Sequence, residues 1–143
     1  MRFVEAVLYG GYARGASRRD SPESATAYRA MLDLARVAWS SDNPSFRQVF
    51  TSRFIPGGSA EQLDWYNDLC LKTASGGIVA DLLSARANVD IVDALAGVGA
   101  RTLVLHARND ARASFELGRR MAAAIPGARF VPLPSRNHLP LAH

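Results

Sequence analysis

The order of apolar and polar positions predicts one early strand, a long helical stretch and a final strand–helix–strand unit. Residues 3–9, FVEAVLY, are apolar and partly β-branched, and the glycine-rich stretch GGYARG follows them, as expected at the end of a strand. Residues 102–107, TLVLHA, form a continuous apolar run, which is typical of a strand buried on both faces of a parallel sheet. A helix is expected over 114–125, and residues 128–133, ARFVPL, predict the last strand.

The middle of the chain has helical spacing throughout. Ser21 and Pro22 open a predicted helix that runs to Trp39, and NPSFRQVFTSRFIP, residues 43–56, predicts a second helix that ends at its proline. Ser59, with glutamine three residues later, resembles a capping box for a third helix. Further helical pieces are expected over 78–87 and 91–95. The predicted organisation is therefore an α/β sheet domain of about three parallel strands, 1–15 and 98–143, interrupted by a helical insertion, 16–97.

Composition bounds the class of protein. The 143 residues are 48% hydrophobic and 21% charged, which suits one domain with a core of its own. The apolar runs end well short of the roughly 18–20 residues that a bilayer requires, and Glu5 interrupts the apolar start. Cys70 is the single cysteine, and no Cys/His spacing fits zinc. We expect a cytoplasmic protein without membrane segments, disulfides, metal or cofactor.

Charge and glycine patterns argue against two kinds of ligand. The formal net charge is +4, but the basic residues are scattered and no aromatic residues interleave with them, which disfavours a nucleic-acid interface. The stretch GGYARG is spaced G-G-x-x-x-G, not G-x-G-x-x-G, and helices replace the second strand that a dinucleotide fold requires. A loop that lines a pocket is the favoured interpretation of this stretch.

Two residues with catalytic potential follow the two late strands. Asp110 comes shortly after the strand at 102–107, and His138 comes shortly after the strand at 128–133. Because the carboxyl ends of parallel strands share one edge of a sheet, the two side chains should meet there. A carboxylate that orients an imidazole leaves the other ring nitrogen free to take a proton from a nucleophile. The alternatives are a turn-forming or helix-capping role for Asp110 and a plain surface histidine. His106 is expected to be packed or bonded to backbone, and His143 to be frayed.

The segment RTLVLHARNDARASFELGRRMAAAIPGARFVPLPSRNH resembles the end of an α/β-hydrolase, in which the triad acid precedes the histidine. VEAVLYGGYARG resembles the strand after the nucleophile helix, and the helical middle resembles the cap of that fold. The likeness covers nearly the whole chain. The chain is especially similar to hydrolase domains attached to bacterial helix-turn-helix regulators or cyclase-like proteins. It implies a truncated α/β-hydrolase in which Asp110 and His138 are the catalytic acid and base.

The sequence departs from this family at the nucleophile. No G-x-S-x-G elbow is present: Ser17 lacks the second glycine, Ser59 has no strand before it, and Cys70 falls inside a predicted helix. The elbow and the oxyanion loop would precede residue 1. The resemblance therefore implies esterase- or lactonase-type hydrolysis of carboxylic esters by ancestry, with little or no activity of the chain alone.

The remaining expectations concern ligands and partners. A small apolar ester or lactone is the expected ligand, and a non-catalytic ligand-binding or regulatory module that self-associates is the alternative function. Aromatic residues at helical spacing are first of all packing residues, but they are also candidates for a substrate pocket. Without a neighbouring strand, residues 3–9 would form an exposed sheet edge, so we expect pairing with a second copy or with a missing amino-terminal half. The candidate pocket residues are Tyr12, Trp39, Phe50, Phe54 and Trp65.

Overall fold

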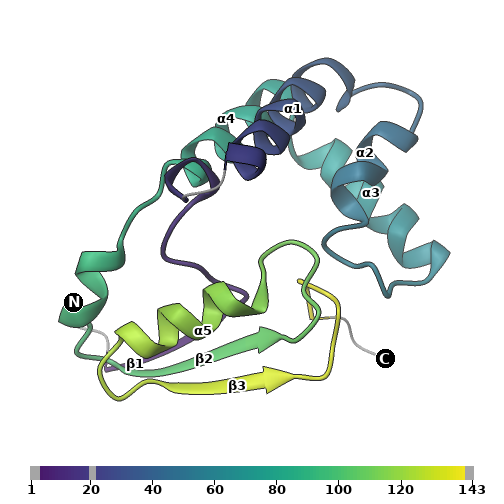
Figure 1. Ribbon diagram of the computed structural model, residues 1–143. Coiled ribbons are helices and arrows are strands. Elements are labelled where there is room, and N and C mark those ends of the chain that lie inside the picture. Colours follow the sequence, from purple (N-terminus) through teal and green to yellow (C-terminus); the bar gives the residue numbers. More distant parts are fainter. Residues whose placement is uncertain (1–3, 20–21, 141–143) are drawn as a thin grey trace. The chain divides into compact units, whose positions relative to one another are not determined.

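The computed structural model describes residues 4–19 and 22–140, and its sheet has three parallel strands, as the sequence predicts (Figure 1). The strand order is β1-β2-β3, so that β2 is central. Tyr9 pairs with Leu105, and Ala107 pairs with Leu133, which brings the carboxyl ends of the strands to one edge. The strands are β1 (Glu5–Tyr9), β2 (Arg101–Ala107) and β3 (Arg129–Leu133).

One face of the sheet packs against helix α5, Phe115–Ala124, which connects β2 to β3 (Figure 1). Val104 of β2 is fully buried beneath it and contributes to a core with Met121 and Ala122. The short 3₁₀ helix η2, Val92–Gly97, packs beside α5. This alternation of strand and helix produces the parallel sheet, because a parallel connection must cross over the sheet.

The helices of the middle segment form a second compact unit. Its core contains Trp39 and Phe50, whose rings meet edge to face at 5.4 Å, and the fully buried Ala35 and Ala80. Gly76 lets α4 approach α1, since a Cβ there would lie 2.5 Å from the carbonyl oxygen of Ala35. The elements are η1 (Ala16–Arg18), α1 (Pro22–Ala38), α2 (Ser45–Thr51), α3 (Ala60–Thr73) and α4 (Gly76–Ala87).

The capping box at the start of α3 is confirmed. The Ser59 side chain accepts a hydrogen bond from the backbone N–H of Gln62, and the Gln62 side chain accepts one from the backbone N–H of Ser59. The second predicted helix is too long, however, because α2 ends at Thr51 and residues 53–57 leave the helical path. Its apolar spacing continued to Phe54, but Phe54 packs in the sheet unit.

The boundaries of the two units differ from the predicted ones. The sheet unit contains the described residues up to Ala13, residues 53–57 and those from Ile91 onward, while 14–52 and 58–90 form the helical unit. Residues 53–57 and 91–97 were predicted in the helical insertion, and residues 14–15 in the sheet. A sequence pattern places a domain boundary where helical spacing changes to strand spacing. The units of the structure depend instead on contacts between residues that are far apart in the sequence, which the pattern does not reveal.

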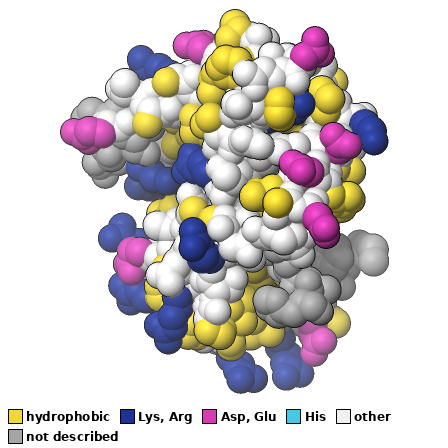
Figure 2. All heavy atoms as spheres, turned by 90° about the vertical axis from the view of Figure 1, so that its right-hand side faces the viewer, with side chains coloured by type: hydrophobic (Ala, Val, Ile, Leu, Met, Phe, Trp, Pro, Cys, Tyr) yellow, Lys and Arg dark blue, Asp and Glu magenta, His cyan; other side chains and the backbone are white. Residues whose placement is uncertain are grey.

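The described residues contain no helix long and apolar enough to cross a membrane. Within the same part of the chain, no group of three His, Cys, Asp or Glu side chains could hold a metal ion. On the face drawn in Figure 2, basic side chains are spread among acidic and apolar ones.

Candidate active site

Asp110 is held in place by the turn that follows β2. Its backbone N–H donates to the carbonyl of Ala107 at 3.3 Å, and its Oδ1 atom accepts the backbone N–H groups of Arg112 and Ala113 at 2.7 and 2.8 Å. An aspartate that bonds backbone N–H groups ahead of it stabilises such a turn. The side chain is fully buried, and Oδ1 is occupied, so that Oδ2 faces the rest of the site.

His138 meets this free oxygen from the loop after β3. Its Nδ1 atom lies 2.8 Å from Oδ2 of Asp110, and 13% of its side chain is exposed. The predicted encounter at the carboxyl edge of the sheet therefore takes place. Because a carboxylate only accepts, Nδ1 carries the hydrogen, and the neutral ring has its lone pair on Nε2. The described residues offer no hydrogen-bond partner to Nε2, so this nitrogen is available to a nucleophile or a substrate.

Asp110 remains ionised in this setting. Burial acts to raise its pKa, but the hydrogen bonds from His138 and from the backbone N–H groups of Ala113 and Arg112, together with the attraction of the imidazole, hold the pKa below the usual value. An ionised carboxylate stabilises the imidazolium that forms when His138 accepts a proton. The carboxylate thus orients the imidazole in the way that a general base requires.

Tyr9, the last residue of β1, lies at the same edge. Its hydroxyl is 3.5 Å from the carbonyl oxygen of Asn137, which is a long hydrogen bond. Burial raises the pKa of the Tyr9 hydroxyl, and the negative charge of Asp110 raises it further. Tyr9 therefore stays protonated and polar at neutral pH beside the pair.

Gly10, directly after Tyr9, is required by the position of the histidine. Its φ angle is +60°, and a Cβ there would lie 2.8 Å from Cε1 of His138. A residue with a side chain would meet both backbone strain and a steric clash. The glycine stretch that suggested a pocket loop in the sequence thus permits the imidazole to lie against the backbone.

His106 is a second histidine near Asp110, but it is a packing residue, as predicted. It is fully buried, and its Nε2 atom donates to the carbonyl of Ala113 at 2.9 Å, while Oδ2 of Asp110 is farther away at 3.6 Å. Nδ1 is buried without a hydrogen-bond partner, and a Cβ at Gly118 would lie 2.1 Å from it. The imidazole therefore fills the space beside α5 that is free because Gly118 has no side chain.

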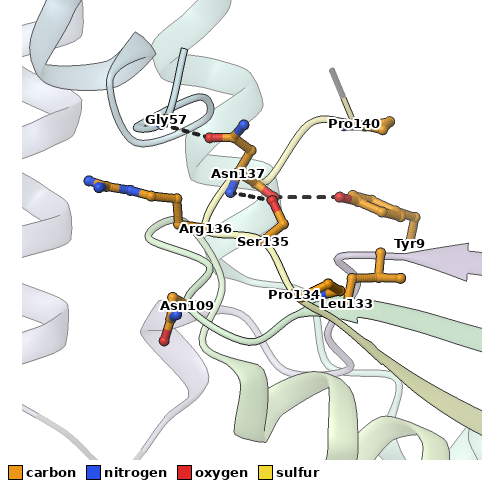
Figure 3. A pocket seen from close by; sticks show the side chains of 9 residues that line it. All are labelled: Tyr9, Gly57, Asn109, Leu133, Pro134, Ser135, Arg136, Asn137 and Pro140. Atoms are coloured by element: carbon orange, nitrogen blue, oxygen red, sulfur yellow. Dashed lines mark hydrogen bonds between the residues drawn. The ribbon is translucent and has the colours of Figure 1, made fainter. Parts of the chain in front are cut away.

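A hollow of about 560 Å³ opens beside the loop that carries His138 (Figure 3). Tyr9, at the end of β1, and Asn137, in the loop after β3, both line this hollow (Figure 3). Oδ1 of Asn137 accepts a hydrogen bond from the backbone N–H of Gly57 at 2.8 Å. The lining residues are Tyr9, Gly57, Asn109, Leu133, Pro134, Ser135, Arg136, Asn137 and Pro140.

None of the five predicted pocket residues lines this hollow. Trp39 and Phe50 are buried in the core of the helical unit, so they are packing residues, and Trp65 is 60% exposed. Tyr12 lies half-buried in the glycine stretch. Phe54 is close to the site, because its ring meets the ring of His138 edge to face at 5.4 Å.

The structure provides no nucleophile elbow among residues 4–19 and 22–140. Ser17 is exposed in η1, and Ser59 caps α3, so neither follows a strand. Cys70 is half-buried within α3, and burial raises the pKa of its thiol, against the opposing effects of a Tyr66 hydrogen bond and the Arg47 charge. His143 lies outside the described residues.

No protein-family model matches the sequence, and no curated protein matches it either. Several solved structures do match this chain. An esterase from Exiguobacterium antarcticum has 21% identity and a TM-score of 0.78 over 94% of this chain and 50% of its own. A malate-bound thermophilic esterase from Thermogutta terrifontis has 26% identity and a TM-score of 0.67, with 92% and 47% covered. An enol-lactonase from Burkholderia xenovorans LB400 has 22% identity and a TM-score of 0.71, with 92% and 48% covered.

The chain thus spans about half the length of the solved structures that it matches. It has the fold of α/β-hydrolases, over the half that carries the cap helices and the last strands of the sheet. The predicted fold is confirmed.

Proposed function

We propose that this chain supplies the acid and the base of a serine-type carboxylic ester hydrolase, with Asp110 orienting His138. The contact of 2.8 Å between Oδ2 of Asp110 and Nδ1 of His138 carries this proposal. In the reaction, Nε2 of His138 takes the proton of the attacking hydroxyl and returns it to the leaving alcohol, while Asp110 remains charged. This acid–base chemistry proceeds without metal or cofactor, and we place it in the cytoplasm.

The attacking hydroxyl would come from a segment outside these 143 residues. Strand β1 pairs with β2 on one side, and no described strand pairs with its other edge. Val7 of β1 is 66% exposed, which is unusual for a strand of a parallel sheet. The unpaired backbone groups of this edge strand favour pairing with a further strand, and the exposed Val7 gives a partner an apolar surface to cover. We propose that an amino-terminal half with the nucleophile occupies it, and a second copy of this chain is the other outcome that a test must distinguish.

The proposed substrate is a small apolar ester or lactone. The names of the matched proteins include esterases and an enol-lactonase, which supports this class of bond. The hollow beside the His138 loop presents Leu133, Pro134 and Pro140, together with a few polar groups that could orient a carbonyl.

The test compares the chain alone with the chain extended by the coding sequence that precedes Met1. Hydrolysis of p-nitrophenyl acetate, p-nitrophenyl butyrate and a simple γ-lactone is followed in each. We expect no hydrolysis above background from the chain alone, and activity in the extended protein that falls by roughly 10³-fold or more in His138→Ala, because losing a triad member costs several orders of magnitude.

Asp64→Asn is the matched control, because Asp64 is exposed on α3 and should leave the rate unchanged. Activity that persists in His138→Ala would overturn the proposal. Ligand-dependent stabilisation without hydrolysis, unaffected by the same substitution, would instead identify a binding module. Static light scattering of the chain alone decides between a free β1 edge and pairing of two copies.

A further inference from the structure

We infer that residues 53–57, which we call the strap, position His138 against Asp110, with Phe54 as the main positioning residue. The strap belongs to the sheet unit, although α2 precedes it and α3 follows it in the sequence. The inference concerns the geometry of the pair, so it holds or fails independently of the proposed hydrolysis.

The strap holds the backbone of the histidine loop. The carbonyl oxygen of Phe54 accepts the N–H groups of both His138 and Leu139, at 2.7 and 3.1 Å. Farther along, the N–H of Gly57 donates to Oδ1 of Asn137 at 2.8 Å. Three consecutive residues of the loop, Asn137 to Leu139, are thereby bonded to two residues of the strap, Phe54 and Gly57, which fixes where the imidazole leaves the backbone.

The same segment also holds the loop of the acid. The Arg53 guanidinium donates from Nε and Nη2 to the carbonyl of Ala111, at 3.3 and 3.2 Å. Ala111 stands between Asp110 and Arg112, whose N–H binds Oδ1 of Asp110. The strap therefore bonds to both loops, and their separation depends on it as well as on the pairing of β2 with β3.

The Phe54 ring adds a side-chain contact to these backbone bonds. It meets the His138 ring edge to face at 5.4 Å and an interplanar angle of 74°, and the Arg112 guanidinium lies 5.5 Å from its centroid. Such contacts are directional, so the ring restricts rotation of the imidazole away from the carboxylate. Ile55 is fully buried and anchors the strap.

The experiment follows the Nδ1 proton of His138 by NMR in the full chain with ¹⁵N-labelled histidine, together with hydrogen–deuterium exchange of the His138 and Leu139 amides. In Phe54→Ala we expect the Nδ1 proton and both amides to exchange at least tenfold faster. Phe54→Leu, which keeps much of the apolar volume but no ring, should fall between it and the wild type. Phe46→Ala is the matched control, because Phe46 is 42% exposed on α2 and lies outside the strap.

Circular dichroism establishes that each variant is folded. If Phe54→Ala does not fold, Phe54→Leu and Asn137→Ala decide the matter, since the second removes the acceptor for the Gly57 N–H without touching the pair. Exchange rates equal to the wild type in the folded strap variants would overturn the inference. Loss of ester hydrolysis plays no part in the readout, so failure of the proposed function would leave this result unaffected.

Discussion

Asp110 uses its two carboxylate oxygens for different partners: Oδ2 lies 2.8 Å from Nδ1 of His138, while Oδ1 accepts two backbone N–H groups of its own turn. The residue that orients the imidazole is therefore the residue that shapes the loop. The alternative interpretation of Asp110 from the sequence, a turn former, is confirmed by these backbone bonds, and the contact with His138 is compatible with the proposed catalytic role. Substitutions at this position should affect stability as well as chemistry.

Asp110→Ala should lower the free energy of unfolding by roughly 2–4 kcal/mol, because it leaves two backbone N–H groups and the imidazole N–H without their acceptor. Asp110→Asn keeps an amide oxygen for the turn and should cost less, on the order of 1 kcal/mol. Urea denaturation measures both. Asp64→Asn, on the exposed face of α3, should stay within about 0.5 kcal/mol of the wild type. Equal stability of all three variants would contradict the assigned bonds.

The contribution of Asp110 to stability should disappear at acid pH. Its folded-state pKa is lowered, so the stabilisation is fully present above the unfolded value of about 3.9 and is lost as the pH falls through the folded pKa. The difference in unfolding free energy between wild type and Asp110→Asn should shrink as the pH falls below about 4. Urea denaturation at a series of pH values tests this. A difference that widens as the pH falls below about 4 would show that the sign is wrong.

The pKa of Tyr9 should report the charge of Asp110. Burial is the larger cause of its raised pKa, and the Asp110 charge is the smaller one. In Asp110→Asn the Tyr9 pKa should fall toward, but not reach, the ordinary value of about 10. A titration of ¹³C-labelled tyrosine, with the signal assigned from Tyr9→Phe, measures the change. Asp64→Asn is the control, and a Tyr9 pKa that is the same in all three proteins would contradict the assigned coupling.

Sequence reasoning succeeded where the geometry of the site follows from strand order. An apolar run ending before Asp110 and another ending before His138 predict two parallel strands, and parallel strands bring their following loops to one edge. No side-chain contact had to be foreseen for this step. The register, with Ala107 opposite Leu133, then leaves each loop only a short path to the other.

The strap and the pocket were beyond sequence reasoning for a physical reason. Phe54 continues the apolar spacing of the helix before it, and a backbone carbonyl that binds a loop more than 80 residues away leaves no trace in local periodicity. Trp39 and Phe50 are packing residues, which is the first of the two roles expected for them, and their spacing alone could not exclude a pocket role, because a ring in a helix core and a ring in a pocket have the same spacing. Pro56 and Gly57, which follow Phe54 and Ile55, mark the end of the helical spacing, but they do not indicate that the helix ends already at Thr51.

Gly118 and His106 offer a test of the packing beneath the site. Alanine normally stabilises a helix interior by about 1 kcal/mol relative to glycine. At Gly118, however, the new Cβ would lie 2.1 Å from Nδ1 of a fully buried imidazole, so Gly118→Ala should instead destabilise the protein by roughly 1–3 kcal/mol in urea denaturation. Gly97→Ala is the control, because no atom lies within 4 Å of a Cβ there, and it should be neutral or slightly stabilising.

A double-mutant cycle identifies the imidazole as the cause. In a His106→Ala background the ring is gone, so adding Gly118→Ala should cost much less than it does in the wild type, or even stabilise the helix. The two free energies of unfolding would then differ by a coupling of about 1–3 kcal/mol. If Gly118→Ala lowered the free energy of unfolding equally in both backgrounds, the new Cβ would clash with a group other than His106. The assignment of the His106 ring to the space between α5 and β2 would then be wrong.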